Sequence, residues 1–470
     1  MGTHIGGIGI FPGYFNPPHI GHLQTMRMAL ECFDELHLFV RYNEGTDLVD
    51  WETKRGWFER INEEMGGRLV IHRMENQAVR GKTYTKEDFF EFIRNTIRSV
   101  GGPVSGFVFG DDYHDTLPVF RKEFPEMYFF QGSRPTVGME RTTSTAIRED
   151  LEGHRDWLPV YVYETLKLLK SAEEIDVAGC PVLGKGFGST VYGLDEKTIV
   201  KVYKEGTPFG KIQKEFELSE SAFQSGVPCV RAYRVVRVGS SFGLVLEKLG
   251  ASLGLTIHQN PEKIEAYADQ YVALAQKLHH TKVTDSVVSP IRERWLSYAD
   301  GLARWCSPDE TALVRDLVGR MPEADNYLHG DLHPGNIMFR GEEPVLIDMA
   351  GLAKGSYLSD LAVIYRGLIM GPASRGISRR EESMGMSARE IREVGDLFFM
   401  KYLDLTGREE LHEVYSKLHL LYALNVVVMC GSESMRDEEL AHMLMDELLR
   451  KVLVPKKDDI MRIWQKGGLL

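Results

Sequence analysis

The sequence has few cysteines, and none of them is placed to form a familiar cysteine site. The 470 residues include five cysteines, an odd number, and no two of them have C-x-x-C spacing. This disfavours both a zinc knuckle and a disulfide framework. The chain also lacks any run of roughly 18 to 20 apolar residues and any signal-peptide pattern at its N-terminus. We therefore expect a cytoplasmic protein in a reducing compartment, with no membrane partner.

The sequence also contains fewer positively charged than negatively charged residues. The 56 Lys and Arg residues are outnumbered by 68 Asp and Glu residues, which gives a formal net charge of −12. Such a chain is not a general binder of nucleic acid or anionic membranes, although a local basic pocket for phosphates remains open. Hydrophobic residues make up 43% and charged residues 26%, as in globular proteins with complete cores. At a domain size of about 150 residues, two or three domains are expected.

The first part of the chain alternates between strand-type and helix-type segments. The apolar strand-type runs are Ile5–Phe11, Leu36–Val40, Leu69–His72 and Phe107–Phe109, and the amphipathic stretches between them are His19–Phe33, Trp51–Glu64 and Phe89–Ile97. This alternation predicts an α/β domain with a doubly wound parallel sheet and helices on both faces. A helix-type stretch, Leu158–Lys170, ends the domain.

A different pattern follows the aperiodic stretch Ser171–Cys180, where we place the boundary between domains 1–172 and 173–470. From Val182 to Glu247 the pattern is that of β-hairpins. Beyond Pro261 helical periodicities dominate, and the tail from Ala388 is almost wholly helical. The second domain is therefore predicted to be a two-lobed α+β unit, with a small β-rich lobe at about 180–250 and a helical lobe at about 251–470.

A loop rich in glycine and proline follows the first strand-type run. It reads GYFNPPHIGH from Gly13 to His22. His19 and His22 are three residues apart, so they share one face of a first helical turn. Gly21 lets a phosphate approach the backbone, where the helix N-terminus supplies free N–H groups. Two imidazoles there could stabilise the charge that develops on the α-phosphate of a nucleotide during in-line attack.

A second element, TSTAIR from Thr143 to Arg148, points to the same chemistry. Ser144 and Thr145 are suited to cap a helix N-terminus, and Arg148 offers a two-pronged donor for phosphate. An ordinary capped helix is the alternative, because Ser and Thr are common at helix starts.

The first loop resembles the HxGH motif of the nucleotidyltransferase superfamily, and TSTAIR resembles the (S/T)xTxIR element of that family. The resemblance implies a Rossmann-like fold with His19 and His22 as catalytic residues. Class I tRNA synthetases share HxGH, but they pair it with a KMSKS-type loop that this sequence lacks, so no nucleic-acid partner is expected. The predicted nucleotide-binding residues of this domain are Gly13, Phe15, Gly21, Asp111, Ser144, Thr145 and Arg148.

Three further segments are similar to one branch of that superfamily, the nicotinate or nicotinamide mononucleotide adenylyltransferases. They are GKTYTKEDF (Gly81–Phe89), GFVFGDDYHDTLPVF (Gly106–Phe120) and STAIREDLEGHRDWLPVYVYETL (Ser144–Leu166). By this resemblance Thr85 and Phe120 face the base of the acceptor and Asp111 lies near the nucleotides, while a core position for Phe120 is the alternative. The Pro-rich PxxxPHK segment of the branch is replaced here by Phe39–Trp51, which leaves the identity of the acceptor open.

A second constellation begins with the glycine-rich turn LGKGFGSTVY, in which Gly184, Gly186 and Gly188 could cover nucleotide phosphates. It is not a P-loop, because Gly186 stands where the magnesium-binding Ser or Thr belongs and the flanks resemble hairpin strands. Lys201 in the next strand-type run, TIVKVY, is suited to grip ATP phosphates. Glu215 on the following helix is the predicted partner of Lys201, with Glu217 and Glu220 as competitors.

The segment LHGDLHPGNIMF, Leu328 to Phe339, contains the predicted catalytic loop of the second domain. The Asp331 carboxylate could accept a hydroxyl proton or orient the hydroxyl for in-line attack. Asn336 and Asp348, which follows a buried strand-type run, are suited to bind Mg²⁺. A phosphate-gripping cation, two metal ligands and a base occur in the order that phosphoryl transfer needs.

HGDLHPGN and IDMAGLAKGSYLSDLA resemble the aminoglycoside phosphotransferase and choline kinase family, as does LAQKLHH (Leu274–His280). The resemblance implies that Asp331 is the base and that Asp348 binds Mg²⁺, with Asp360 ordering the catalytic loop from behind. HGD in place of HRD, IDMA in place of DFG and the lack of APE argue against a protein substrate. A small hydroxyl or amino compound is therefore expected.

A kinase makes a phosphomonoester and a nucleotidyltransferase of this type consumes one. The leading hypothesis is therefore a bifunctional enzyme that uses Mg²⁺ and ATP, with a pyridine ribonucleoside or ribonucleotide as acceptor. A phospho-alcohol or sugar phosphate with CTP as donor is the second candidate. A nucleotide sensor with one inactive domain and an antibiotic kinase with an appended domain are the other classes. The expected partners are small molecules and nucleotides, and a homo-oligomer is left open.

Overall fold

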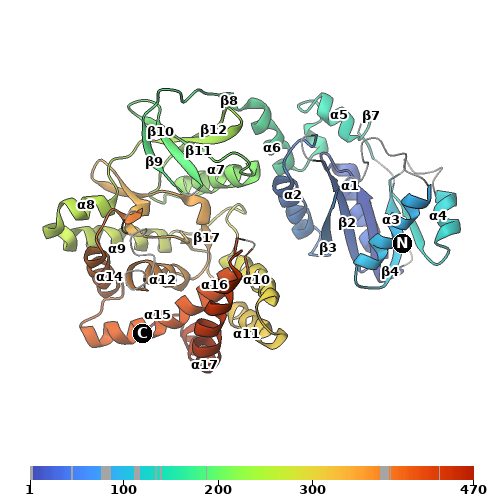
Figure 1. The fold of residues 1–470 in the computed structure, drawn as a ribbon. Coiled ribbons are helices and arrows are strands. Elements are labelled where there is room, and N and C mark those ends of the chain that lie inside the picture. The colour runs from blue at the N-terminus through green and yellow to red at the C-terminus, as the bar shows by residue number, and fades with distance from the viewer. Residues whose placement is uncertain are drawn as a thin grey trace. The chain divides into compact units, whose positions relative to one another are not determined.

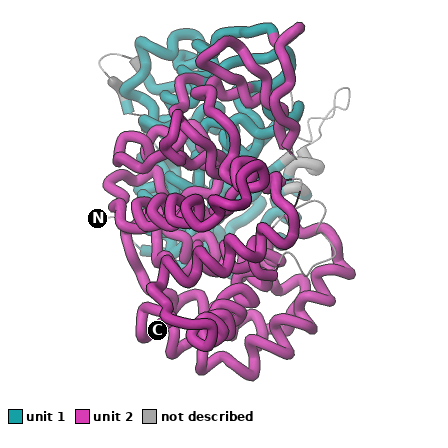
Figure 2. The backbone as a smooth tube through the Cα atoms, turned by 90° about the vertical axis from the view of Figure 1, so that its left-hand side faces the viewer, with its two compact units in different colours: residues 1–176, 203–213, 235–242 teal, residues 177–202, 214–234, 243–470 magenta. Residues whose placement is uncertain are grey.

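The computed structural model describes residues 4–43, 46–75, 86–110, 117–132, 135–137, 140–186, 188–370, 381, 383–432 and 434–470. Contacts within the chain divide it into two compact units (Figure 2). The first contains residues 1–176, 203–213 and 235–242, and the second contains residues 177–202, 214–234 and 243–470.

A five-stranded parallel sheet forms the centre of the first unit (Figure 1). Its strand order is β3 (Leu69–Glu75), β2 (Glu35–Tyr42), β1 (Ile8–Gly13), β4 (Val104–Phe109) and β5 (Tyr128–Gln131). Every neighbouring pair is parallel, which confirms the predicted doubly wound, Rossmann-like sheet. The chain runs from β1 to both sides of the sheet, so the carboxyl end of β1 is a topological switch point, where such sheets bind ligands.

Alternate residues of each strand enter different hydrophobic clusters, one on each face of the sheet. Phe11 and Val108 pack on the face that also contains Leu23 of α1 and Phe58 of α2. On the other face, the neighbouring strand residues Ile10, Phe107 and Phe109 pack with Phe90 of α3 and Leu117 of α4. Helices therefore cover both faces, as the alternating pattern predicts. The helices of this unit are α1 (Ile20–Cys32), α2 (Trp51–Glu64), α3 (Lys86–Ser99), α4 (Leu117–Glu123), α5 (Ser144–Glu149) and α6 (Val160–Ser171).

A mixed sheet forms the β-rich lobe that follows. Its order is β8 (Glu173–Glu174), β12 (Ala232–Val238), β13 (Ser241–Glu247), β11 (Thr198–Tyr203), β10 (Ser189–Gly193) and β9 (Val182–Lys185), and α7 (Phe209–Gln224) joins β11 to β12. The sequence predicts the hairpin strands but not β8, which lies in the aperiodic stretch. Because β8 forms by pairing with Val236 and Arg237 of a strand far along the chain, its own two glutamates do not reveal it.

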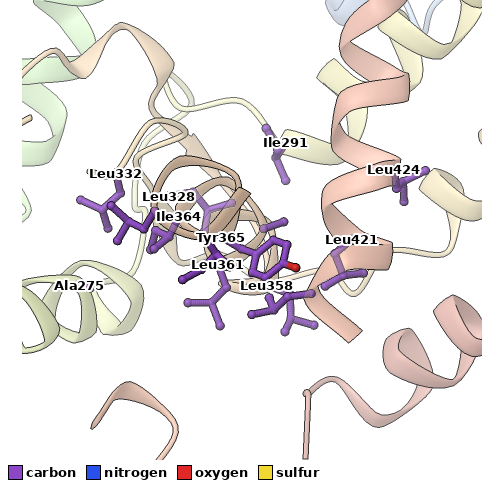
Figure 3. Close-up of a cluster of buried hydrophobic side chains, with 14 of the residues drawn as sticks. Ala275, Ile291, Leu328, Leu332, Leu358, Leu361, Ile364, Tyr365, Leu421 and Leu424 are labelled. Atoms are coloured by element: carbon purple, nitrogen blue, oxygen red, sulfur yellow. The ribbon is translucent and has the colours of Figure 1, made fainter. Parts of the chain in front are cut away.

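Helices make up most of the remaining chain, as predicted. They are α8 (Leu253–Gln259), α9 (Ile264–His280), α10 (Ile291–Asp300), α11 (Pro308–Gly319), α12 (Leu358–Tyr365), α14 (Ala388–Tyr402), α15 (Arg408–Cys430), α16 (Glu438–Leu444) and α17 (Val454–Lys466). Figure 3 shows Leu361 and Ile364 of α12 near Ala275 of α9, in the cluster that also holds Leu421 of α15. In the part of the chain whose structure is described, no helix combines the length and apolarity needed to cross a bilayer.

Short strands between α11 and α12 carry the predicted catalytic loop. They are β14 (Tyr327–Leu328), β15 (Ile337–Arg340), β16 (Glu343–Leu346) and β17 (Ala353–Lys354). β14 pairs with β17, and β15 pairs with β16. The loop from His329 to Asn336 therefore leaves one two-stranded ladder and enters another.

We predict that Gly106→Ala destabilises the first unit. A Cβ at Gly106 would lie 2.3 Å from the backbone oxygen of Tyr128 and 2.9 Å from the Phe33 ring, so the sheet would have to shift. Overpacking of this kind costs about 1–3 kcal/mol and should lower the midpoint of thermal unfolding. Gly56→Ala in α2 is the control, because its Cβ would meet no described atom within 4 Å and alanine favours the helix. Equal midpoints for the two variants would contradict the prediction.

Candidate functional site

His19 and His22 lie together at the start of α1, with ring centroids 3.8 Å apart. His19 is the N-cap of the helix, and its Nδ1 accepts from the backbone N–H of Gly21 at 3.2 Å. The Nδ1 atom of His22 accepts in turn from the backbone N–H of His19 at 3.3 Å. When both Nδ1 atoms accept, a neutral imidazole carries its proton on Nε2. Both rings are thereby set as Nε2 donors at a helix N-terminus, which is the arrangement that a phosphate needs.

Phe15 supports this pair from within the core. Its backbone has a left-handed φ of +43° and its side chain is 2% exposed. The ring contacts His22 edge-on at 4.9 Å, and a Cβ at Gly13 would lie 2.4 Å from it. Packing therefore holds Phe15 in a strained conformation, a common feature of functional loops. The predicted nucleotide-site residues Gly13 and Phe15 consequently shape the loop, and the Phe15 ring faces the protein interior.

Helix α5 is fastened to the histidine loop. Ser144 Oγ donates to the carbonyl of Pro17 at 2.9 Å, and Arg148 Nη1 donates to the carbonyl of Asn16 at 2.7 Å. The N-cap is Thr143 and not Ser144 or Thr145, because the helix begins one residue earlier than the sequence suggests and Thr143 Oγ1 accepts from Ala146. Arg148 Nη2 donates to Thr145 Oγ1 at 3.0 Å. Ser144 and Arg148 therefore position the histidine loop.

The other site residues predicted for this domain are partly described by the structure. Phe120 is 1% exposed and packs edge-on against Phe90 and Phe109, so the structure gives it the core position that the sequence leaves open as the alternative. Thr85 and Asp111 lie outside the described residues. Gly21 lies where a Cβ would come within 2.8 Å of Thr142 Oγ1, so the close packing of this turn requires glycine.

In the second unit, Lys201 of β11 contacts two carboxylates. Its Nζ lies 2.7 Å from Glu215 Oε1 and 2.8 Å from Asp348 Oδ1, so the structure selects Glu215 over Glu217 and Glu220. Burial would lower the pKa of Lys201, but the two carboxylates outweigh it and raise the pKa above its ordinary value. The side chain is therefore a permanent cation, as a phosphate ligand requires.

The catalytic loop is held from behind by Asp360, as the resemblance implies. The carboxylate is 1% exposed and accepts from the backbone N–H groups of His329 and Gly330 at 2.7 and 2.8 Å. His279 Nε2 lies 3.1 Å from the same carboxylate. Burial would raise the pKa of Asp360, but these hydrogen bonds and His279 lower it below its ordinary value. Gly330 has a φ of +82° at this point, where a Cβ would lie 2.7 Å from the Gly351 carbonyl.

Asp331 lies in this loop near a histidine and an arginine side chain. Its carboxylate is 3.6 Å from His333 Nε2 and 3.9 Å from Arg366 Nη2. Partial burial would raise the pKa of Asp331, but His333 and Arg366 outweigh it and lower the pKa to about 2. A carboxylate with a pKa this low is a weak base. It orients a hydroxyl by accepting a hydrogen bond from it more readily than it removes the hydroxyl proton before the attack. Sequence reasoning missed His333, although it lies inside the quoted motif, and Arg366, which is 35 residues away from Asp331.

Asn336 and Asp348 are placed side by side by a hydrogen bond from the Ile347 N–H to the Asn336 carbonyl, 3.0 Å long. Asn336 Nδ2 donates to the backbone carbonyl of Asp331 at 2.9 Å, which identifies this amide atom as the nitrogen. The other amide atom, Oδ1, is therefore the one that can serve as a metal ligand. Asp348 has a left-handed φ of +59°. Two oxygen donors suit Mg²⁺, which takes one or two protein ligands plus phosphates and water. In the described ranges no group of three or more His, Cys, Asp or Glu forms a metal cluster.

The glycine-rich turn joins β9 to β10, where Gly186 N donates to the Ser189 carbonyl at 2.8 Å. A Cβ at Gly184 or Gly188 would meet no described atom within 4 Å. Packing of the described atoms therefore does not require these two glycines.

A cavity of about 180 Å³ lies beside the catalytic loop in the helical lobe. Its lining includes Trp295 and Tyr298 of α10, Gly330 of the loop, Arg366, and Met429 of α15. Aromatic and apolar walls with a few polar groups are typical of small-molecule sites.

Two family models match parts of the chain. Residues 10–61 match the model described as Cytidylyltransferase-like, and residues 180–383 match the Phosphotransferase enzyme family. A nicotinamide-nucleotide adenylyltransferase from Pyrobaculum arsenaticum is 28% identical over 181 residues, which are 36% of this chain and 93% of that protein. The resemblance of the two halves to these families is therefore confirmed. The chain is a transferase with a nucleotidyltransferase-like domain and a phosphotransferase domain.

Solved structures match at low identity. The ADP-bound aminoglycoside phosphotransferase APH(2'')-Ib is 15% identical with a TM-score of 0.40, over 62% of this chain and 97% of that chain. A choline/ethanolamine kinase family protein from Mesorhizobium loti is 13% identical with a TM-score of 0.38, over 67% of this chain and 99% of that chain. The assignment of the second domain rests on the family model and on the geometry of the described residues.

We predict that His333→Ala shifts the acid limb of ADP formation to higher pH. The predicted role of Asp331 requires its ionised form, and His333 helps to lower its pKa to about 2. Without His333 the pKa rises by about one unit or more toward the ordinary value of an aspartate, so activity is lost earlier as the pH falls. The measurement is the pH profile of ADP release from ATP.

His280→Ala is the control for this shift, because that side chain is exposed and bonds only the backbone of its own helix among the hydrogen bonds described. An acid limb at the same pH in the His333 variant and the unmodified protein would contradict the role given to His333.

Proposed function

We propose that the chain catalyses two consecutive reactions. The C-terminal domain phosphorylates a hydroxyl group of a small molecule with ATP, and the N-terminal domain transfers a nucleotidyl group from ATP or CTP to the phosphomonoester formed. The observation that carries the proposal is that one chain holds two separate sets of groups suited to bind phosphates, and the first proposed reaction makes the class of compound that the second consumes. The partners are small molecules and nucleotides.

In the kinase step, Lys201 grips the ATP phosphates and Asp331 orients the acceptor hydroxyl, which enters from the cavity beside the loop. The acceptor oxygen bonds to the γ-phosphorus, the bond to the β,γ-bridging oxygen breaks, and ADP leaves. The hydroxyl proton passes to the Asp331 carboxylate and then to solvent. Because this transition state is loose, the proton moves late, and the low pKa of Asp331 supports an orienting role. Asn336 and Asp348 would hold Mg²⁺, which when bound neutralises charge on the β- and γ-phosphates.

In the nucleotidyl step, an oxygen of the phosphomonoester attacks the α-phosphorus of the nucleotide. The bond between the α-phosphorus and the oxygen that bridges to the β-phosphorus breaks, and pyrophosphate leaves. His19 and His22 donate from Nε2 to the oxygens on which charge develops, and the N-terminus of α1 adds its partial positive charge. Nothing in this step needs a covalent intermediate with the protein.

Two acceptor classes fit the N-terminal domain. The adenylyltransferase from Pyrobaculum arsenaticum acts on a nicotinamide nucleotide, and its similarity to this chain supports a pyridine ribonucleotide with ATP as donor. The Cytidylyltransferase-like family match and the altered segment Phe39–Trp51 support a phospho-alcohol or sugar phosphate with CTP. Candidate alcohols supplied with ATP and CTP would be compared by the mass of the product.

We predict that Asp331→Ala and His22→Ala remove different reactions. Loss of the base should slow phosphorylation by about 10²- to 10⁴-fold, and loss of one charge-stabilising donor should slow nucleotidyl transfer by about 10²- to 10³-fold. Each variant should keep the other activity, measured by mass spectrometry of the two products. If one change silenced both reactions in a folded protein, the two-site proposal would fail. It would also fail if the phosphorylated product never became linked to a nucleotide.

A further inference from the structure

Lys54 of α2 is a buried cation in the first unit. Its side chain is 0% exposed, and that of its partner Asp47 is 1% exposed. Lys54 Nζ donates to Asp47 Oδ2 at 2.7 Å, to the Tyr14 carbonyl at 2.8 Å and to the Arg41 carbonyl at 3.0 Å. An ammonium group has three protons, so these three bonds use its whole donor capacity.

The three acceptors come from three different segments. Tyr14 belongs to the histidine loop after β1, Arg41 lies near the carboxyl end of β2, and Asp47 belongs to the segment that precedes α2. Two further hydrogen bonds join the same parts, from Asn43 Nδ2 to Tyr14 Oη at 2.7 Å and from Leu48 N to Asn16 Oδ1 at 3.2 Å. One buried cation therefore ties the segment after β2 to the loop that carries the two histidines.

Stability alone does not explain this pair. Burial lowers the pKa of Lys54, and the Asp47 carboxylate only partly opposes that effect. Buried ion pairs are often no more stabilising than apolar side chains of similar size. The second carboxylate oxygen, Asp47 Oδ1, is also buried without a hydrogen-bond partner among the described residues, which adds a further cost. Because burying Lys54 and Asp47 has these energetic costs, we expect such a pair at a place where it fixes the position of neighbouring segments.

The position of the Lys54–Asp47 pair indicates which segments it holds in place. Loops after adjacent parallel strands lie at the same edge of the sheet, where ligands bind. Ser144 and Arg148 of α5 brace the histidine loop at Pro17 and Asn16, which places the nucleotide-side element there. The segment 46–50, which follows β2, is also fastened to this loop, through the hydrogen bond from Leu48 N to Asn16 Oδ1, and so can shape a second side of the site.

We infer that Lys54 is a positioning residue that, with Asp47, holds the segment 46–50 against the histidine loop as the acceptor-side wall of the nucleotidyl site. This inference rests on the proposed function. The pair sets the affinity for the phosphomonoester, while the histidines set the rate of attack. A change in the pair therefore raises KM for the acceptor with little effect on kcat or on KM for the nucleotide.

The test separates positioning from stability with two variants. Lys54→Met leaves two carbonyls and a carboxylate without their donor, so it should lower both thermal stability and acceptor affinity. The double variant Lys54→Met/Asp47→Leu replaces the pair with apolar side chains and should regain the stability of the unmodified protein. Its KM for nicotinamide mononucleotide, with ATP as donor, should stay raised by about tenfold or more because the wall is no longer fixed. Recovery of both stability and KM in the double variant would overturn the inference.

Hydrogen exchange gives a readout that does not depend on turnover. In the double variant the peptide covering residues 46–50 should exchange faster than in the unmodified protein, because the segment is no longer held where Leu48 N–H can donate to Asn16 Oδ1. Lys122→Met is the matched control, since that lysine is exposed on α4, and it should change neither exchange nor KM. If the unmodified protein transferred no nucleotide to any phosphomonoester, the proposed function would fail by itself. Unchanged exchange at 46–50 in the double variant would overturn the positioning role whatever the activity.

Discussion

A buried charge that satisfies backbone groups of a loop is the physical constraint shared by the two candidate sites. The backbone N–H and C=O groups of such a loop are not paired within a helix or a sheet, so other groups must serve as their hydrogen-bond partners. In the second unit the Asp360 carboxylate accepts from two loop N–H groups. In the first unit the Lys54 ammonium donates to two carbonyls, one of them in the histidine loop. Both charges have a buried partner, His279 and Asp47 respectively, which makes their burial tolerable.

The two candidate sites carry different groups for the charge of a triphosphate. The first holds two imidazoles, each with its Nδ1 bonded to a backbone N–H, beside the partial charge of a helix N-terminus, which suits a reaction at the α-phosphate. The second uses a lysine held as a cation by two carboxylates, with Asn336 and Asp348 suited to a metal ion, which fits transfer of the terminal phosphate. Neither arrangement needs a chain of positive net charge. A net charge of −12 is therefore compatible with the proposal of two local nucleotide sites.

Most of the fold follows from periodicity, and the contacts that refine the sites do not. Strand-type runs separated by amphipathic stretches predict the parallel sheet, because the strand side chains alternate between the two hydrophobic clusters while each helix packs its apolar face into one of them. The order along the chain also predicts Glu215 as a partner of Lys201 but leaves Glu217 and Glu220 as competitors, and the 2.7 Å contact in the structure selects Glu215. By contrast, the approach of Arg366 to Asp331 depends on how α12 packs, and the sequence between them carries no signal for it.

Motif resemblance gives residue types at a site more reliably than it gives the direction of each side chain. Phe15 and Phe120 occur in segments that resemble ligand-binding motifs, yet both rings are buried in aromatic clusters. The N-cap at Thr143 shows a similar limit, since residues 142–145 are four consecutive Ser and Thr residues that can each cap a helix, and in the structure Ser144 Oγ donates to Pro17 instead. The importance of Lys54 is visible only when its three acceptors are brought together by the fold.

The most direct test of the account is the number of nucleotides that the intact chain binds at equilibrium. Calorimetric titration with Mg²⁺ and non-hydrolysable analogues of ATP and CTP should give two sites per chain. Lys201→Ala should remove one site and leave the other with its affinity unchanged, because each triphosphate is held by its own residues. A single site in the unmodified protein, or the loss of all binding in the Lys201 variant while it remains folded, would contradict the account.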